Sequence, residues 1–310
     1  MDTFIDRLVA AVRRTKTPAL VGLDPRFEQL PSGLTADLDI RRPEHVAEAY
    51  RKFCCDVIDV VHPLVPAVKP QMAFFEQLGP AGMQALADTV QYAGQRGLMV
   101  ILDGKRNDIG STAAAYAEAY LGGSQSLGLA ADALTVSPYL GDDSLTPFVD
   151  VAVRSDTGVF VLVKTSNPGG ALFQDLESNG CPLYEHVAVH IEGLADDTQS
   201  TMGYGAVGAV VGATYPEQLA RLRSLMPHSW FLVPGFGAQG GTAQDVAAAF
   251  DDRGLGAIVN SSRAIIFAHA RNEYQQKYGD RRWQAAVEAA TLEMITRLQN
   301  DTPAGALVEA

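Results

Sequence analysis

Short apolar runs and amphipathic helical patterns alternate along this chain of 310 residues, and the alternation repeats eight times. Strands that alternate with helices form parallel sheets, because each helical crossover returns the chain to the same edge. Eight such units predict an α/β fold, a closed (β/α)8 TIM barrel, rather than an open doubly wound sheet. The strands are expected at residues 19–24, 66–70, 97–102, 131–136, 158–164, 207–211, 230–233 and 256–260. The helices are expected at 44–62, around 80–95, 111–121, 144–154, 182–194, 216–225, 242–250 and in a final region through residue 298.

The chain is longer than such a barrel requires, which is about 250 residues. The excess lies in an additional N-terminal helix, in the loop 25–42 and in the segment 167–182. This last segment opens with Asn167-Pro168-Gly169-Gly170, a turn-rich sequence that indicates a mobile lid. No low-complexity linker divides the chain, so we expect a single domain over residues 1–310, with a frayed tail at 301–310.

Composition and charge limit the classes of function. A net charge of −12 argues against nucleic acid or an anionic membrane surface as a partner. No apolar run approaches the ~20 residues that span a membrane, and residues 1–9 form an amphipathic helical pattern rather than a signal peptide. The three cysteines, two of them adjacent in a helical pattern, are expected to be reduced core residues rather than metal ligands. We therefore expect a cytoplasmic protein.

One of the predicted strands is followed directly by charged residues. The apolar run 97–102 is followed by Asp103-Gly104-Lys105, and Asp108 follows in the loop before the next helix. Side chains two apart on a strand share a side, so Asp103 and Lys105 are expected to point the same way. A solvated strand end with a salt bridge is the simpler interpretation. At the carboxyl end of a parallel barrel strand, however, such a cluster indicates an active site.

Charged and polar residues also end the neighbouring strands. Asp24 ends the first strand and Lys69 lies near the end of the second, so both are expected beside Asp103 and Lys105 at one mouth of the barrel. Alternating charges within ~4–6 Å of one another hold each other ionised. Taken alone, Lys69 could equally be a surface lysine whose stem lies along the protein. Its position opposite Asp103 favours the site.

The last two strands supply a candidate phosphate site. Gly235-Phe236-Gly237-Ala238-Gln239-Gly240-Gly241-Thr242 follows the seventh strand, and Ser261-Ser262-Arg263 follows the eighth. Paired helix N-termini after these strands bind phosphate in many barrels, and Arg263 can bind an anion through two donors.

Two further patterns are disfavoured. The segment 235–240 matches the Gly-x-Gly-x-x-Gly dinucleotide fingerprint, but the next strand ends at Asn260 instead of the acid that the fingerprint requires. His186 and His190 have metal-compatible spacing on a predicted helix, but no glutamate follows His186 and no third ligand is evident. An ordinary amphipathic helix face explains them better.

These motifs together resemble a known family. Asp103-x-Lys105-x-x-Asp108-Ile109 resembles the signature of orotidine 5′-phosphate decarboxylases, and nearly the whole predicted barrel supports the resemblance. Lys69 is similar to the first lysine of that family's Lys-Asp-Lys-Asp charge network. The other matching positions imply substrate binding: Asp24 at the ribose, Ser166 at the pyrimidine, Pro234, Gln239, Ser262 and Arg263 around the phosphate, and Ile109 and Thr112 beside a substrate across the subunit boundary.

The resemblance implies decarboxylation of orotidine 5′-phosphate to UMP and CO2, the last step of de novo pyrimidine nucleotide biosynthesis, with no cofactor and no metal. Lys105 would stabilise the carbanion and donate the proton, and Asp103 would press against the substrate carboxylate. Lys69 and Asp108 would fix the geometry. The family also implies a homodimer with shared active sites, in which Asp108 reaches the neighbour's site.

Two features are similar to the type 2 branch of the family. Ser262 stands before Arg263 where the family often has glycine, which puts backbone phosphate contacts at that position in doubt, and the loop 25–42 is longer than in compact members.

Two alternatives remain open at this point. Sugar-phosphate members of the same suprafamily, a keto-gulonate phosphate decarboxylase or a hexulose phosphate synthase, look similar around Asp103 and Lys105. They use Mg2+ and place a carboxylate where this chain has Lys69, which would repel the ion. The chain could also be a noncatalytic sensor of nucleotide phosphates built on a barrel, although both lysines and both aspartates would then lack a purpose.

Overall fold

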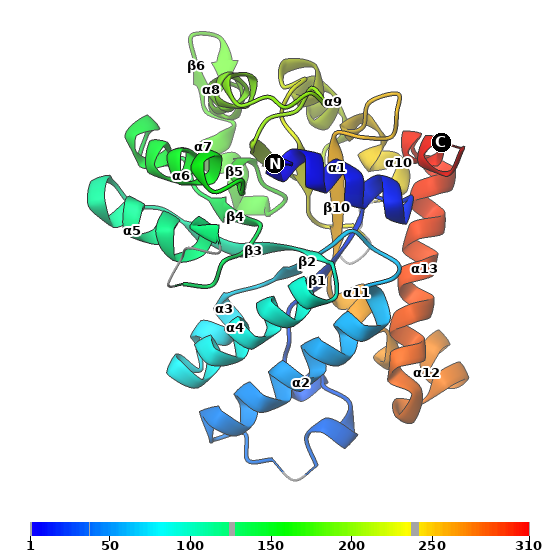
Figure 1. Ribbon diagram of the computed structural model, residues 1–310. Helices are drawn as coiled ribbons and strands as arrows, with labels where there is room; N and C mark the ends of the chain where they lie inside the picture. The colour runs from blue at the N-terminus through cyan, green and yellow to red at the C-terminus, as the bar shows by residue number, and fades with distance from the viewer. Residues whose placement is uncertain (1, 37, 124–127, 237–241, 310) are drawn as a thin grey trace.

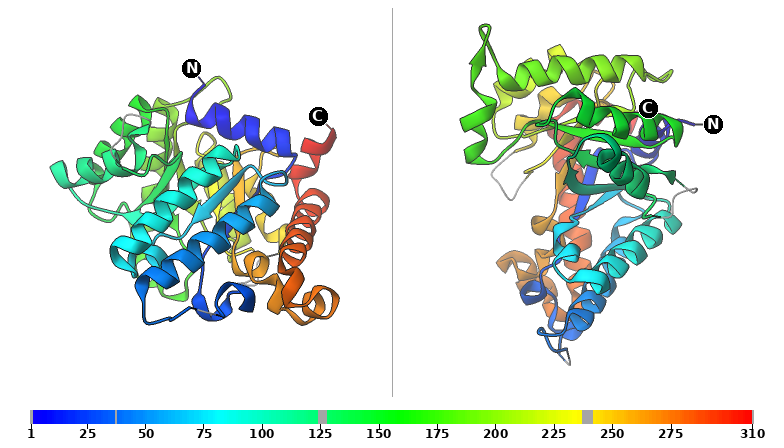
Figure 2. Two further views of the ribbon diagram at one scale, coloured as in Figure 1. Left: turned by 60° about the horizontal axis from the view of Figure 1, so that its bottom comes forward. Right: turned by 90° about the vertical axis from the view of Figure 1, so that its left-hand side faces the viewer.

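The computed structural model describes residues 2–36, 38–123, 128–236 and 242–309. Within these residues, eight parallel strands close into a barrel in the order β1-β10-β9-β8-β5-β4-β3-β2. The predicted TIM barrel is therefore confirmed, and Figures 1 and 2 show the helices arranged around the strands. The barrel strands are β1 (Ala19–Leu23), β2 (Ala67–Pro70), β3 (Met99–Arg106), β4 (Ala133–Val136), β5 (Gly158–Lys164), β8 (Val207–Val211), β9 (Phe231–Val233) and β10 (Ala257–Ser261).

The helices lie close to their expected positions. A small hairpin, β6 (Glu177–Ser178) and β7 (Cys181–Pro182), projects from the barrel in the segment after β5 (Figure 2). The α-helices are α1 (Phe4–Thr15), α2 (Pro43–Val61), α3 (Ala73–Glu76), α4 (Gly79–Gln95), α5 (Gly110–Leu121), α6 (Asp142–Arg154), α7 (Ala171–Gln174), α8 (Leu183–Asp197), α9 (Pro216–Leu225), α10 (Ala243–Val246), α11 (Arg263–Ile266), α12 (Asn272–Tyr278), α13 (Trp283–Asp301) and α14 (Ala306–Glu309). Short 3-10 turns include η1 (Phe27–Gln29), η2 (Ser32–Leu34), η4 (Pro168–Gly170), η5 (Ala247–Ala249), η6 (Ala268–Ala270), η7 (Asp280–Arg282) and η8 (Pro303–Gly305).

The expected N-terminal helix, α1, covers the amino-terminal end of the barrel (Figure 1). Its buried face packs Phe4 edge-on against Phe160 of β5, with ring centroids 6.2 Å apart. Arg7 donates to the Asp132 carboxylate just before β4 at 2.9 Å. Gly158 has to be small here, because a Cβ would lie 2.2 Å from the Phe4 ring. With this end closed by α1, the opposite, carboxyl-terminal end is the one left for chemistry.

The barrel interior is filled by the strands themselves, which are buried along nearly their whole length. Valine, isoleucine and leucine dominate these runs, as expected for a parallel sheet covered by helices. The burial ends where β3 becomes polar, after Asp103. The hydrophobic core therefore holds the charged strand ends on a rigid base.

Three local features differ from the sequence-based expectation. β3 continues to Arg106 instead of ending at residue 102. The helix expected at 242–250 is a single α-turn, α10, followed by η5. The tail 301–310, expected to be frayed, forms η8 and α14 in its described part. Ala304 and Leu307 are buried there, and this burial offsets the entropy that would otherwise leave a chain end disordered. Lys16, at the end of α1, also donates to the carbonyl of Val308 at 3.2 Å.

Candidate active site

Asp103 lies between two lysines at the carboxyl-terminal mouth of the barrel. Its Oδ2 is 2.7 Å from Lys69 Nζ and its Oδ1 is 2.5 Å from Lys105 Nζ. Lys69 and Asp103 are buried, whereas the Lys105 side chain is about half exposed toward the cavity. The structure thus brings together the three charged residues whose proximity the sequence predicted.

Two uncharged residues complete the hydrogen bonding of this carboxylate. Gln71 Nε2 donates to Asp103 Oδ2 at 3.1 Å, and Thr135 Oγ1 donates to Oδ1 at 3.1 Å. The sequence analysis did not single out either residue. A polar residue two positions beyond Lys69 and a threonine inside the apolar strand β4 were the signals that could have identified them.

The electrostatics of the cluster favour its charged form. Burial alone would raise the pKa of Asp103, but Lys69 and Lys105 outweigh it and hold that pKa well below its usual value. Burial would likewise lower the pKa of Lys69, but the carboxylates of Asp103 and Asp24 overcome burial and raise it. The mouth of the barrel therefore carries fixed charges of both signs in a largely desolvated place.

Two adjoining cavities open onto this cluster and share Lys69, Asp103 and Pro234. The larger, of about 620 Å3, has polar walls at Lys105, Thr135, Thr165, Ser166, Asn167 and Gln174 and apolar walls at Leu162, Val210, Leu232 and Phe173. The smaller, of about 160 Å3, extends toward Asp24, Gln71, Gly235, Phe236, Asn260, Ser262 and Arg263. An elongated polar ligand could place one part beside Lys105 and another beside Arg263.

The smaller cavity presents acceptor oxygens. Asp24 Oδ1 and Asn260 Oδ1 are buried and have no hydrogen-bond partner among the described residues. Asn260 Nδ2 contacts Ser262 Oγ at 3.3 Å, and a Cβ at Gly22 would lie 1.8 Å from that same oxygen. Gly22 therefore leaves room for the Ser262 side chain, and the two free acceptors suit the hydroxyl groups of a sugar.

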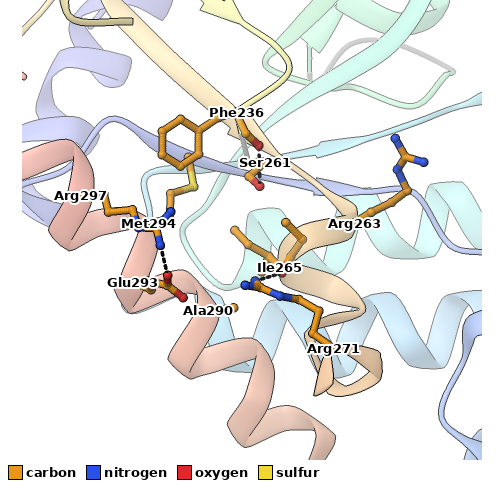
Figure 3. A pocket seen from close by; sticks show the side chains of 10 residues that line it. Phe236, Ser261, Arg263, Ile265, Arg271, Ala290, Glu293, Met294 and Arg297 are labelled. Carbon is orange, nitrogen blue, oxygen red and sulfur yellow. Dashed lines mark hydrogen bonds and ion pairs between the residues drawn. The ribbon is translucent and has the colours of Figure 1, made fainter. Parts of the chain in front are cut away.

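Arg263 begins α11 directly after β10 and lines the smaller cavity. It also borders a separate cavity of about 420 Å3, in which Figure 3 shows the Arg263 side chain directed away from Arg271, Glu293 and Arg297. The helices α10 and α11 are one turn long, so a helix dipole contributes little, and the Arg263 guanidinium supplies positive charge at this end. Gln239, expected at the phosphate, lies outside the described residues.

The segment after β5, which the sequence predicts to be a lid, is held to the end of that strand by side-chain contacts. Thr165 donates its backbone N–H to Gln174 Oε1 at 3.1 Å, and Gln174 Nε2 donates to Thr165 Oγ1 at 2.8 Å. Lys164, which is buried, forms an ion pair with Asp175 at the end of α7. Ser166 lines the larger cavity as expected, together with Asn167, Gly169 and Gly170 of the predicted lid.

Three predicted site residues lie elsewhere. Asp108, Ile109 and Thr112 line neither of the two cavities in the described part of this chain. Asp108 Oδ1 accepts the backbone N–H of Ile109 at 2.8 Å, and the Ile109 side chain is 53% exposed. The structure therefore does not bring these three residues together with Lys69, Asp103 and Lys105.

The two histidines with metal-compatible spacing make separate local contacts. His186 Nε2 lies 2.8 Å from the carbonyl oxygen of Ser178, and His190 Nε2 lies 2.8 Å from Asp142 Oδ1. The described ranges contain no group of three or more His, Cys, Asp or Glu side chains that could hold a metal ion. Nor does any helix among them have the length and apolar character needed to cross a membrane.

Comparison with known proteins gives one consistent result. The profile of the orotidine 5′-phosphate decarboxylase / HUMPS family matches residues 20–278. The orotidine 5′-phosphate decarboxylase of Rhodopirellula baltica is 57% identical over 301 residues, which cover 96% of this chain and 100% of the relative. That of Deinococcus radiodurans is 44% identical over 86% of this chain and 90% of its own length. The solved structure of Leishmania donovani OMP decarboxylase is 34% identical, covers 99% of both chains and superposes with a TM-score of 0.74.

Proposed function

Because the chain belongs to the orotidine 5′-phosphate decarboxylase family, we propose that the charged mouth of its barrel is the decarboxylation site. The chain is a carboxy-lyase that converts orotidine 5′-phosphate to UMP in pyrimidine biosynthesis. The observation that carries the placement of the site is Asp103, held between Lys69 at 2.7 Å and Lys105 at 2.5 Å.

The charges suit a reaction that forms a carbanion. Loss of CO2 from C6 of the pyrimidine leaves an electron pair that the ring delocalises poorly, so preorganised positive charge is the available source of stabilisation. Lys105 faces the larger cavity, supplies that charge and donates the proton to C6. Asp103 lies where the substrate carboxylate would approach, which opposes the ground state more than the product. Lys69 keeps Asp103 ionised and in place.

The two cavities suggest how the nucleotide binds. The pyrimidine occupies the larger cavity beside Ser166, and the ribose hydroxyls reach Asp24 in the smaller one. The phosphate binds Arg263, with Ser262 and Pro234 beside it. Binding energy from this remote group then contributes to closing the site. Two ammonium groups at the reacting end disfavour a divalent cation, and the family resemblance implies a reaction that needs no organic cofactor.

The same proposal extends to the assembly and the compartment. Asp108, Ile109 and Thr112 serve the site of a second subunit, so the active form is a homodimer with shared sites. Cys54, Cys55 and Cys181 are free thiols, which fits a reducing, cytoplasmic location.

The role of Lys105 is tested by removing its amine. Lys105→Ala should abolish decarboxylation by more than about 1,000-fold, because both the stabilising charge and the proton are lost. It should also abolish exchange of the C6 hydrogen of UMP in heavy water, followed by NMR, since exchange passes through the same carbanion. UMP binding, measured by calorimetry, should persist.

A matched control is Lys52→Ala, which removes an exposed lysine of α2. This variant should keep both decarboxylation and exchange. If Lys105→Ala retains exchange, another group protonates C6 and the proposed role is wrong.

A further inference from the structure

The catalytic strand β3 contains an irregularity directly at Lys105. β3 pairs with β4 through Leu102 and Leu134, and the pairing resumes only at Arg106 and Val136. Residues 103–105 of β3 therefore face a single residue of β4, Thr135. Lys105 absorbs the mismatch with a φ of 45°, in the left-handed region that residues with a side chain rarely adopt. Such a conformation persists only where neighbouring contacts hold it.

The Thr135 hydroxyl contacts both catalytic residues across this irregularity. Lys105 donates its backbone N–H to Thr135 Oγ1 at 2.9 Å, and Thr135 Oγ1 donates its own proton to Asp103 Oδ1 at 3.1 Å. The hydroxyl has one proton, so accepting from Lys105 and donating to Asp103 is a compatible pair of roles. Thr135 is 1% exposed, so water has little access to these two bonds.

Other contacts support the backbone of the irregularity without joining the two charged side chains. Arg106 Nη1 donates to the carbonyl oxygen of Gly104 at 3.1 Å. A Cβ at Gly104 would lie 2.6 Å from Met72 Sδ, so a larger residue here would displace the Met72 side chain. These contacts support the path of the chain, whereas the Thr135 hydroxyl contacts both Asp103 and Lys105.

We propose that Thr135 is a positioning residue of the reaction, which uses one hydroxyl to hold Lys105 in its left-handed conformation and to orient Asp103. The proposal rests on the decarboxylation site assigned above and adds to it a residue that acts through its neighbours. A proton donor has to be held within a few tenths of an ångström of its productive position. An uncharged threonine of the neighbouring strand therefore controls the rate.

The test replaces the hydroxyl with a methyl group of similar size. In Thr135→Val the Lys105 N–H loses its acceptor and Asp103 loses one donor, while the volume is kept. We expect kcat to fall by about 10- to 100-fold, the range for a lost buried hydrogen bond at a reacting group. KM should change by less than about threefold, and the rate of C6 hydrogen exchange of UMP in heavy water should fall in parallel with kcat. Thr135→Ser restores the hydroxyl and should recover both rates to within about threefold of the original enzyme.

A buried threonine far from the site provides the control. Thr157 lies directly before β5 and donates to the carbonyl oxygen of Leu121 at 3.0 Å. Thr157→Val should lower the melting temperature and leave kcat and exchange unchanged. If Thr135→Val does not fold, Thr135→Ala is compared with Thr135→Ser by the same two rates, and the alanine variant should be the slower.

Two results would overturn the proposal. One is a kcat of Thr135→Val, per folded active site, within twofold of the original enzyme. The other is a loss of kcat in Thr135→Ser that equals the loss in Thr135→Val, or in Thr135→Ala where that variant replaces it. A failure of the proposed role of Lys105 gives a distinct result. In that case Lys105→Ala would retain C6 hydrogen exchange, whatever residue stands at position 135.

Discussion

At the scale of single residues, burial and neighbouring charges have opposite effects on the pKa of Asp103. Burial would raise its pKa, and the two neighbouring lysines lower it by more. Because the folded-state pKa lies below the unfolded value, the carboxylate stabilises the fold above a pH of about 4. That contribution is lost as the pH falls from there through the folded-state pKa.

Asp103→Asn should therefore destabilise the protein in a pH-dependent way. The change leaves the buried ammonium of Lys69 without its nearest partner, so the free energy of unfolding at pH 7 should fall by about 3–5 kcal/mol. Urea unfolding of both proteins at pH 7, 5 and 3.5 measures the difference. It should be the same at pH 7 and 5 and smaller at pH 3.5. A difference that grows toward low pH would contradict the account.

Arg263 is the residue whose role depends on a remote part of the substrate. Arg263→Ala should reduce kcat/KM for orotidine 5′-phosphate. The loss should correspond to about 2–5 kcal/mol of activation free energy, the cost of removing one partner of a desolvated charge pair. Turnover of orotidine, which lacks the phosphate, should hardly change. Steady-state kinetics with both substrates measure the two values of kcat/KM. An equal loss of kcat/KM for both substrates would show that Arg263 has a structural role instead.

The sequence predicted the charged residues of the site better than the uncharged ones. Asp24, Lys69, Asp103 and Lys105 were predictable because charged side chains are costly at the end of a buried strand unless they pair or bind a ligand there. Thr135 and Gln71 gave only weak signals, because a single threonine inside a strand and a glutamine just after one are common outside active sites. The left-handed Lys105 was invisible as well, because it arises from pairing between β3 and β4 rather than from a local motif.

At the scale of elements, the segment after β5, predicted from the sequence to be a lid, borders the larger cavity and is joined to β5 by an ion pair. Lys164, the last residue of β5, pairs with Asp175 and lies 5.1 Å from the centre of the Tyr184 ring. Phe173 and Gln174 of α7 line the larger cavity just before this anchor. The ion pair therefore holds the residues that follow α7 against the end of β5.

Breaking this anchor should weaken substrate binding more than chemistry. Lys164→Met keeps the length of the side chain and removes the ion pair, and Asp175 is exposed enough to remain solvated. We expect KM for orotidine 5′-phosphate to rise about fivefold, which corresponds to about 1 kcal/mol, with kcat within twofold.

Asp175→Asn should have the same effect, and the double variant should be no worse than either single one, because the two side chains act as a pair. Additive losses in the double variant would show that Lys164 and Asp175 act separately.

Element positions followed from periodicity, and their exceptions have physical causes. β5 and α9 match their predicted bounds, because apolar runs and a starting proline define them. The expectation of a frayed tail at 301–310 was wrong, since the burial of Ala304 and Leu307 depends on contacts far away in the sequence. Local sequence cannot reveal a docking surface that only the closed barrel creates.

At the scale of the whole molecule, a single chain brings only some of the predicted site residues together. Lys69, Asp103 and Lys105 meet in a single chain, whereas Asp108 and Thr112 lie outside its cavities in the described structure. A two-fold interface is reciprocal, so each subunit of the proposed dimer would give one Asp108 and receive one. The sequence could suggest this arrangement only through the family resemblance, because a single chain contains no signal for the symmetry of its assembly.

Mixing two inactive variants tests the shared site. Lys105→Ala and Asp108→Ala should each be nearly inactive as homodimers. When equal amounts are unfolded and refolded together, random pairing makes about half of the dimers mixed. In each mixed dimer one site carries both changes and the other carries neither. Activity should therefore return to roughly a quarter of that of the unmodified enzyme. Two different affinity tags on the two variants allow the fraction of mixed dimers to be measured in the same sample. No recovery in the presence of mixed dimers would place Asp108 in the site of its own subunit, and the dimer would then have no part in the chemistry.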